Sequence, residues 1–264
     1  MTFQFSFKRI LFGFSVLLLF SCVSKKDMIY YQDIDSMVNE SGPNSFEIKI
    51  QPDDLLSIIV SAEDPEIAAP FNLKTVALQS ARNVDSGAGQ VTQQLYLVDA
   101  SGHIEFPVLG KIKVSGLSRS AVLNLFQQKI GAYIKNPIVN LRVANFKVSL
   151  QGEVNAPGTY TISSERVTLI EALSMAKDLT IYGKRNNILI IREIDGVKSF
   201  NRVDITKAGF INSPFYYLSQ NDVVYVEPNQ NKINGAAVGP STSIIFSITS
   251  ILITLATLII STSR

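Results

Sequence analysis

The sequence predicts an α+β fold in which strands dominate, closed by one long apolar helix. Three observations carry this prediction. Between residues 46 and 228, short runs with apolar side chains at every second position are separated by turn residues, as in residues 46–50 (Phe-Glu-Ile-Lys-Ile). Two segments of this body instead place apolar side chains at helical spacing. From residue 244 to residue 260 every side chain is apolar or carries a hydroxyl group.

The first 21 residues have the pattern of a signal peptide. Lys8 and Arg9 precede an apolar run, residues 10–20, that is too short to span a bilayer. The following Ser21-Cys22 resembles a bacterial lipobox, which implies cleavage before Cys22 and lipidation of its thiol. The alternative is an uncleaved anchor helix with an incidental cysteine. Cys22 is the only cysteine, so disulfides and thiolate metal clusters are excluded.

The charge balance argues against a nucleic-acid partner. The chain has 24 Lys and Arg against 22 Asp and Glu, and Lys8 and Arg9 are two of the basic residues. The chain from Cys22 onward therefore carries equal numbers of both signs. Such a balance indicates neither nucleic acid nor a strongly anionic partner.

Residues 22–45 are predicted to form a lipidated tether. This stretch is polar and contains Ser41-Gly-Pro-Asn-Ser45. A lipid at Cys22 followed by a tether would let a folded body stand off a membrane. Tyr30 and Tyr31 lie inside the tether and are a candidate docking element for a partner.

The first predicted domain covers residues 46–146. Asp53-Asp54 forms a turn before a strand at 55–60, and 80–94 is expected to be a mobile loop. A hairpin is predicted to join 95–98 to 103–106 through the turn residues 99–102. A helix follows, with Ser118 as its N-cap and an apolar face that includes Val122, Phe126 and Ile130.

The second predicted domain covers residues 147–227. Thr168-Leu-Ile-Glu171 has the pattern of a capping box, and strands are expected at 187–193, 200–205 and 222–226. Phe215, Tyr216 and Tyr217 form an aromatic cluster that could stack on sugar. The alternative is that such a run is core on one side and ordinary surface on the other.

The order of these motifs resembles the polysaccharide export domain of Wza-type outer-membrane proteins. The resemblance rests on residues 51–60, 96–110 and 136–141, with the helix between the last two. The Gly-Glu-Val-Asn-Ala-Pro-Gly-Thr-Tyr run at 152–160 and the closing strand at 222–226 resemble an SLBB domain, which is a β-grasp-like module. Export domain followed by SLBB domain is the arrangement of that polysaccharide biosynthesis/export family.

After a linker at 228–242, residues 243–261 are predicted to form a C-terminal transmembrane helix. As a helix these residues would extend over roughly 28 Å, close to the hydrocarbon thickness of a bilayer. One stripe of this helix carries small hydroxyl residues, which permit close helix packing: Ser243, Ser247, Ser250, Thr254, Thr257 and Ser261. The alternative is a monomeric anchor whose hydroxyls bond to carbonyls of their own helix.

The resemblance to this family also implies an assembly, a location and a partner that the residues alone do not indicate. It implies a ring of about eight subunits, with the terminal helices around a pore in the outer membrane and the C-terminus at the cell surface. The stripe would then face the lumen or the neighbouring helix. The lipid-anchored body would lie in the periplasm and meet an inner-membrane polysaccharide co-polymerase or tyrosine autokinase.

Catalysis has little support in the sequence. His103 is the only histidine, which excludes a multi-histidine metal site, and we expect it on a strand surface. No nucleophile elbow, phosphate loop or dinucleotide fingerprint is present. We therefore predict no catalytic, metal or cofactor site.

The sequence thus favours an oligomeric outer-membrane channel lipoprotein that exports capsular or extracellular polysaccharide. One alternative is a structural, sugar-binding envelope lipoprotein that transports nothing. Another is an envelope component of a protein-secretion or adhesion system.

Overall fold

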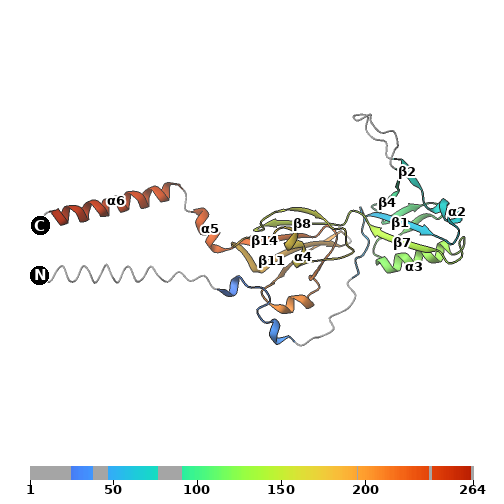
Figure 1. Cartoon of the computed structure of the whole chain (residues 1–264), viewed down its shortest axis with the longest axis horizontal. Coiled ribbons are helices and arrows are strands. Elements are labelled where there is room, and N and C mark those ends of the chain that lie inside the picture. The colour runs from blue at the N-terminus through green and yellow to red at the C-terminus, as the bar shows by residue number, and fades with distance from the viewer. Residues whose placement is uncertain (1–24, 38–46, 77–90, 195, 238–239, 263–264) are drawn as a thin grey trace.

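The computed structural model describes residues 25–37, 47–76, 91–194, 196–237 and 240–262. Two folded domains, each with its own core, lie one after the other along the molecule, and the C-terminal helix projects from the second (Figure 1). The predicted signal peptide, Cys22 and most of the loop at 80–94 lie outside the described residues.

The first domain is built on a three-stranded sheet with the order β4-β1-β7. Both neighbours run antiparallel to the central strand β1 (Leu55–Ser61): β4 (Leu95–Leu97) on one side and β7 (Ile138–Val143) on the other. The smaller elements are α2 (Pro65–Ala68), η3 (Ala69–Phe71), and the paired strands β2 (Lys74–Val76) and β3 (Val91–Gln93). The side chains of Leu56, Ile58 and Val60 alternate into the core, as the period-two pattern predicted.

The predicted helix of this domain is confirmed as α3 (Arg119–Ile130). The Ser118 hydroxyl accepts a hydrogen bond from the Ala121 amide at 3.2 Å, which satisfies one of the free N–H groups of the first turn. Val122, Phe126 and Ile130 are fully buried, and the Phe126 ring meets the Phe106 ring edge-on at 4.9 Å between centroids. The helix therefore closes the core over the sheet.

The predicted hairpin between residues 95–98 and 103–106 is wrong. Strand β4 pairs with β1, whereas β5 (His103–Phe106) pairs with β6 (Gly110–Lys113). The Gly102 carbonyl accepts from the Val114 and Ser115 amides at 2.9 and 3.0 Å, which extends the pairing of β5 with β6. Gly102 has a φ of 79°, and a Cβ there would lie 2.5 Å from the Ser115 Cβ, so only glycine permits this close crossing of the chain.

The second domain is a five-stranded sheet with the order β12-β11-β14-β8-β9. Its strands are β8 (Lys147–Gly152), β9 (Gly158–Thr161), β11 (Gly183–Ile194), β12 (Val197–Val203) and β14 (Val223–Pro228). The other elements of this domain are β10 (Val167–Thr168), α4 (Leu169–Met175), η4 (Ala208–Asn212) and β13 (Tyr217–Leu218). Buried residues of α4 and η4 share one core with the inward residues of the sheet, such as Ile188, Ile190 and Val224.

The predicted capping box of α4 is confirmed. The Thr168 hydroxyl accepts from the Glu171 amide at 3.1 Å, while the Glu171 carboxylate accepts from the Thr168 amide at 2.7 Å. Both groups of this reciprocal pair are thus satisfied, which fixes where the helix begins.

Residues 25–37, which we call the N-terminal strap, pack against the second domain. They contain η1 (Lys25–Asp27) and η2 (Ile34–Ser36). The amides of Tyr31 and Gln32 donate to the carbonyls of Ile205 and Thr206 at 3.3 and 2.8 Å. The Tyr30 hydroxyl donates to Asp178 at 2.6 Å. Residues predicted as tether therefore form part of a folded domain, and Tyr30 and Tyr31 dock within their own chain.

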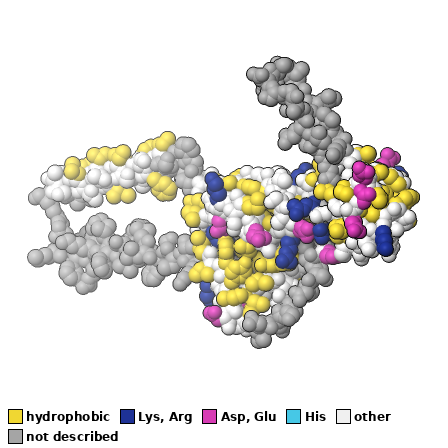
Figure 2. Space-filling view, turned by 45° about the vertical axis from the view of Figure 1, so that its right-hand side comes forward, with side chains coloured by type: hydrophobic (Ala, Val, Ile, Leu, Met, Phe, Trp, Pro, Cys, Tyr) yellow, Lys and Arg dark blue, Asp and Glu magenta, His cyan; other side chains and the backbone are white. Residues whose placement is uncertain are grey.

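The chain ends in two helices, α5 (Gln230–Ala237), within the predicted linker, and α6 (Pro240–Thr262). Large apolar side chains along α6 are exposed, including Phe246 at 68% (Figure 2). No helix among the described residues is both long and apolar enough to cross a membrane, so the predicted transmembrane helix at residues 243–261 is wrong. Hydroxyl side chains recur along α6 and dilute its apolar character. The expected surface position of the C-terminus depended on that helix.

Candidate functional site

The two domains meet at a polar joint formed by the Asp53-Asp54 turn, Asn145 and Gln220. The Asn145 side chain accepts from the Leu55 amide and donates to the Asp53 carbonyl, both at 2.9 Å. Gln220, from the second domain, donates to the Asn145 carbonyl at 2.9 Å and accepts from the Lys147 amide at 2.8 Å. A continuous chain of hydrogen bonds therefore crosses from one domain to the other.

Asp54 is the buried carboxylate of this joint. One of its oxygens accepts from the Gln51 amide at 2.8 Å, and the other is a buried acceptor with no hydrogen-bond partner among the described residues. Burial raises the pKa of Asp54 to about 6, and the hydrogen bond from Gln51 opposes this only in part. The predicted turn is confirmed, but it also carries an incompletely satisfied acid.

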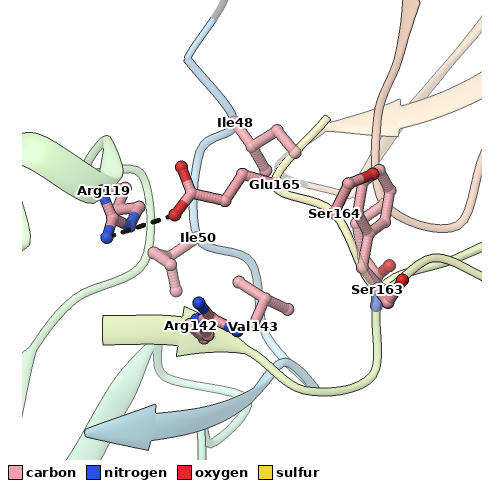
Figure 3. Close-up of a pocket in the computed structure, with 10 residues that line it drawn as sticks. Ile48, Ile50, Arg119, Arg142, Val143, Ser163, Ser164 and Glu165 are labelled. Atoms are coloured by element: carbon pink, nitrogen blue, oxygen red, sulfur yellow. Dashed lines mark ion pairs between the residues drawn. The ribbon is translucent and has the colours of Figure 1, made fainter. Parts of the chain in front are cut away.

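A pocket of about 180 Å³ opens on one side of the joint (Figure 3). Its apolar lining comprises Ile48, Ile50, Val143 and Phe146. Glu165, from the second domain, reaches across to Arg119 at the start of α3, with 3.3 Å between carboxylate oxygen and guanidinium nitrogen (Figure 3). This ion pair bridges the two domains over an apolar floor.

A larger and more polar cleft of about 620 Å³ opens near the same joint. The first domain supplies Asp53, Ser101, Lys113 and Ser115, and the second supplies Glu193 and Asn221. The two domains therefore enclose space that neither encloses alone, which is where ligand sites commonly form.

His103 lies beside a serine and an aspartate, but the arrangement is not that of a catalytic triad. The Ser101 hydroxyl donates to Asp99 at 2.6 Å, so its proton is directed away from the His103 ring, whose Nδ1 is 3.0 Å from the same hydroxyl. In a triad the histidine stands between the two. The bonds from Ser101 and from the His103 amide instead lower the pKa of Asp99, as in a structural turn.

The aromatic cluster at 215–217 is half-buried. The Tyr216 ring packs against Phe210 and Tyr217 at 5.5 and 5.0 Å between centroids, which places it against the core. The guanidinium of Arg166 lies 5.3 Å from the centre of the Tyr217 ring. These rings are held by neighbours, and a role in sugar contact remains a prediction.

Beneath this cluster lies an ion pair that sequence reasoning missed. The guanidinium of Arg192 lies 5.1 Å from the centre of the Phe215 ring and binds the fully buried Asp222 through two nitrogens, at 3.0 and 2.7 Å. It also donates to the Tyr217 carbonyl at 3.0 Å. The two residues are 30 positions apart, so only the folded sheet brings them together.

Part of the hydroxyl stripe of α6 bonds to its own helix. Ser250, Thr254 and Thr257 each donate to a carbonyl three or four residues earlier at 2.8 Å. Thr249, which lies off the stripe, does the same with Ile245. These donors are therefore satisfied without a partner chain. The Ser243 side chain lies outside the described residues.

No group of three or more metal-binding side chains occurs within the ranges that the structure describes. The geometry therefore offers two interdomain cavities, one aromatic cluster and one exposed apolar helix as candidate functional surfaces.

Comparison with known proteins gives a consistent result. A model of the polysaccharide biosynthesis/export protein family matches residues 42–144, and a model of the SLBB domain matches residues 146–226. The EPS I polysaccharide export outer membrane protein EpsA of Ralstonia solanacearum is 29% identical over 217 residues, which are 80% of this chain and 55% of that protein. The protein of the same name from Ralstonia nicotianae is 30% identical over 203 residues, 74% of this chain and 51% of that protein. The chain thus spans about half the length of these curated relatives.

Proposed function

Because this chain belongs to the polysaccharide biosynthesis/export family, with one SLBB domain after the export domain, we propose that it takes part in exporting a capsular or extracellular polysaccharide across the outer membrane. The observation that carries the proposal is the match of both domain models in this order, together with relatives named polysaccharide export outer membrane proteins. We assign the chain a passive, non-enzymatic role in which other proteins supply energy and control polymer length.

We propose lipidation of Cys22 as the membrane attachment. Cys22 precedes the first described residue, Lys25, by three positions, a reach of about 10 Å for an extended chain. The strap that follows is bonded to the SLBB domain, and α5 leaves the same domain after β14. This arrangement favours an SLBB domain that lies near the outer membrane and an export domain that points into the periplasm (Figure 1).

We also propose that copies of the chain assemble into a ring around a conduit, of about eight subunits as the family resemblance implies. Exposed apolar side chains cover α6, and the helix carries no charged residue that would repel a second copy. Small hydroxyl residues on the stripe would let two copies of α6 pack closely, and the donors of Ser250, Thr254 and Thr257 are already satisfied within the helix. The export domains of the ring would present their outer ends to an inner-membrane co-polymerase or autokinase.

Deletion of residues 241–264 tests this function. We expect loss of polysaccharide from the cell surface while the two domains remain folded, as judged by circular dichroism of the purified chain. Retained surface polysaccharide would contradict the conduit and would favour a lipoprotein that only anchors sugar.

Leucine substitutions test the stripe itself. Replacing Ser247, Ser250, Thr254 and Thr257 together by leucine should abolish export, because bulky side chains prevent close helix packing. Thr249→Leu is the matched control, since Thr249 makes the same bond to its own helix but lies off the stripe. If both variants export polysaccharide equally well, the stripe has no role in export.

A further inference from the structure

Strand β12 of the SLBB domain is an edge strand without a neighbour on its outer side. The order β12-β11-β14-β8-β9 leaves β12 and β9 at the two edges of the sheet, and neither pairs with another strand within the described ranges. The two edges differ in length, since β12 has seven residues and β9 has four. An edge exposes a row of N–H and C=O groups that can bond to another strand.

Strand β12 lacks two of the features by which proteins usually protect such an edge, proline and a bulge. It contains no proline, and its register with β11 continues without a bulge from Val197 to Val203. Val197 and Phe200 are 70% and 66% exposed, among the most exposed apolar side chains of the folded domains. A regular, partly apolar edge strand of this length favours pairing with a further strand.

The charged residues of β12 do not prevent such pairing. Lys198 pairs with Glu193 at 3.7 Å and Arg202 pairs with Glu227 at 2.7 Å, so both positive charges are balanced within the same domain. An incoming strand would therefore meet no uncompensated row of charge at this edge.

The strand directions indicate which strand fits there. Strand β12 runs antiparallel to β11, β11 antiparallel to β14, β14 parallel to β8, and β8 antiparallel to β9. The two edge strands consequently run in opposite directions. When a second copy of the chain is placed beside the first in the same orientation, its β9 meets β12 in the antiparallel sense, which gives the more stable of the two ladders.

We infer that the SLBB domains of neighbouring copies join edge to edge, with β12 of one copy paired to β9 of the next. This contact is head-to-tail, so each copy uses a different edge on each side, and repetition of the contact closes into a ring when the rotation permits. The inference rests on the proposed ring and names the surface that forms it.

The register of the sheet predicts which side chains would meet. Phe200, Ile191, Val223, Ser149 and Thr159 form one row across the five strands, on the same face of the sheet. In a continued sheet, Phe200 of one copy would lie beside Thr159 or Thr161 of the next. Contact between an aromatic ring and a β-branched residue is a favourable cross-strand pair.

A charge placed at the edge tests the contact. Phe200→Lys should abolish the oligomer seen by native mass spectrometry of the full chain in detergent, because a lysine on an edge opposes strand pairing. Ile181→Lys is the matched control, since Ile181 is 64% exposed but lies outside both edge strands. An oligomer that survives Phe200→Lys unchanged overturns the inference, as does a wild-type chain that is monomeric throughout.

Cysteine trapping tests the pairing partner in the full chain carrying Cys22→Ser. The variants Phe200→Cys with Thr159→Cys, and Phe200→Cys with Thr161→Cys, should give disulfide-linked ladders of several subunits under oxidation. Phe200→Cys alone should give no linked product. A linked dimer from that single variant would show a two-fold β12–β12 contact and overturn the head-to-tail arrangement.

The two proposals can fail separately. If a closed oligomer forms but neither double-cysteine variant links it, the edge contact is wrong and the ring stands. If the ladder forms but deletion of residues 241–264 leaves export intact, the edge contact stands and the conduit is wrong.

Discussion

Each of the two domains buries one aspartate completely, but the two are satisfied in different ways. In the SLBB domain, Asp222 receives two nitrogens of Arg192 and the Ser219 amide. In the export domain, Asp54 receives the Gln51 amide, and its second oxygen has no partner among the described residues. Burial raises the pKa of both carboxyls, and the Arg192 charge opposes the rise only for Asp222.

The two aspartates also differ in their place in the molecule. The Asp222 pair joins β11 to the start of β14 and holds the Tyr217 carbonyl, so it fixes the interior of one domain. Asp54 instead lies at the joint, where the groups around it belong to both domains. An unsatisfied buried acceptor is costly.

The largest effect on stability should follow from breaking the ion pair between Arg192 and Asp222. Asp222→Ala leaves Arg192 buried without a counter-charge, and we expect it to destabilise the protein by about 3–5 kcal/mol. Urea unfolding measures the change. Arg192→Met combined with Asp222→Leu removes both charges and should recover most of the loss. If the double variant were as unstable as the single one, packing rather than charge would explain the cost.

Asp54 should give a smaller effect that depends on pH. Its folded pKa lies above its unfolded value, so the folded state holds the proton more tightly, and stability should fall as pH rises from about 4 to about 6. A shift of this size corresponds to at most about 3 kcal/mol. Asp54→Asn should remove this fall, as measured by thermal unfolding at a series of pH values. An unchanged pH profile in the variant would show that Asp54 is not the titrating group.

The N-caps of α3 and α4 should differ in how much each stabilises the protein. Thr168→Ala removes a hydroxyl that accepts from the Glu171 amide and donates to the Glu171 carboxylate, and it should cost about 1–2 kcal/mol, while the bond from the Thr168 backbone amide to Glu171 remains. Ser118→Ala removes the bond from the Ala121 amide and should cost about 0.5–1 kcal/mol. Urea unfolding of both variants provides the comparison. Equal costs would mean that the bond from the Thr168 hydroxyl to the Glu171 carboxylate adds nothing.

The ion pair between the domains should have the smallest effect on stability. Arg119 and Glu165 are both partly exposed, so Glu165→Gln should change the free energy of unfolding by less than about 1 kcal/mol. It should nevertheless increase the range of angles between the two domains in small-angle X-ray scattering. Lys198→Gln removes an exposed ion pair within one domain and is the control. The same scattering curve for both variants would contradict a bridging role.

Local sequence signals predicted the local structure well. The Ser118 cap, the apolar face of α3 and the Thr168–Glu171 capping box are each set by residues within one or two helical turns, and all three are confirmed. The resemblance to export and SLBB domains is also confirmed, because it rests on motifs that keep their order along the chain.

Features that depend on distant contacts were not predicted. The pairs Arg192–Asp222 and Arg119–Glu165 form only after the strands and domains are in place. The predicted hairpin was wrong because a turn signal does not say which strands pair across it. The predicted transmembrane helix was wrong, because no helix among the described residues is both long and apolar enough to cross a membrane.

The bonds of the N-terminal strap also have a mechanical consequence. A pull between the strap and α5 would stretch the bonds from Tyr31 and Gln32 to residues 205 and 206, and then the ladder between β11 and β14. The export domain lies between strap and SLBB domain in sequence but outside this path of force. Tension along an assembly held by the SLBB domains would therefore pass through the strap and the SLBB sheet and would not load the export domain.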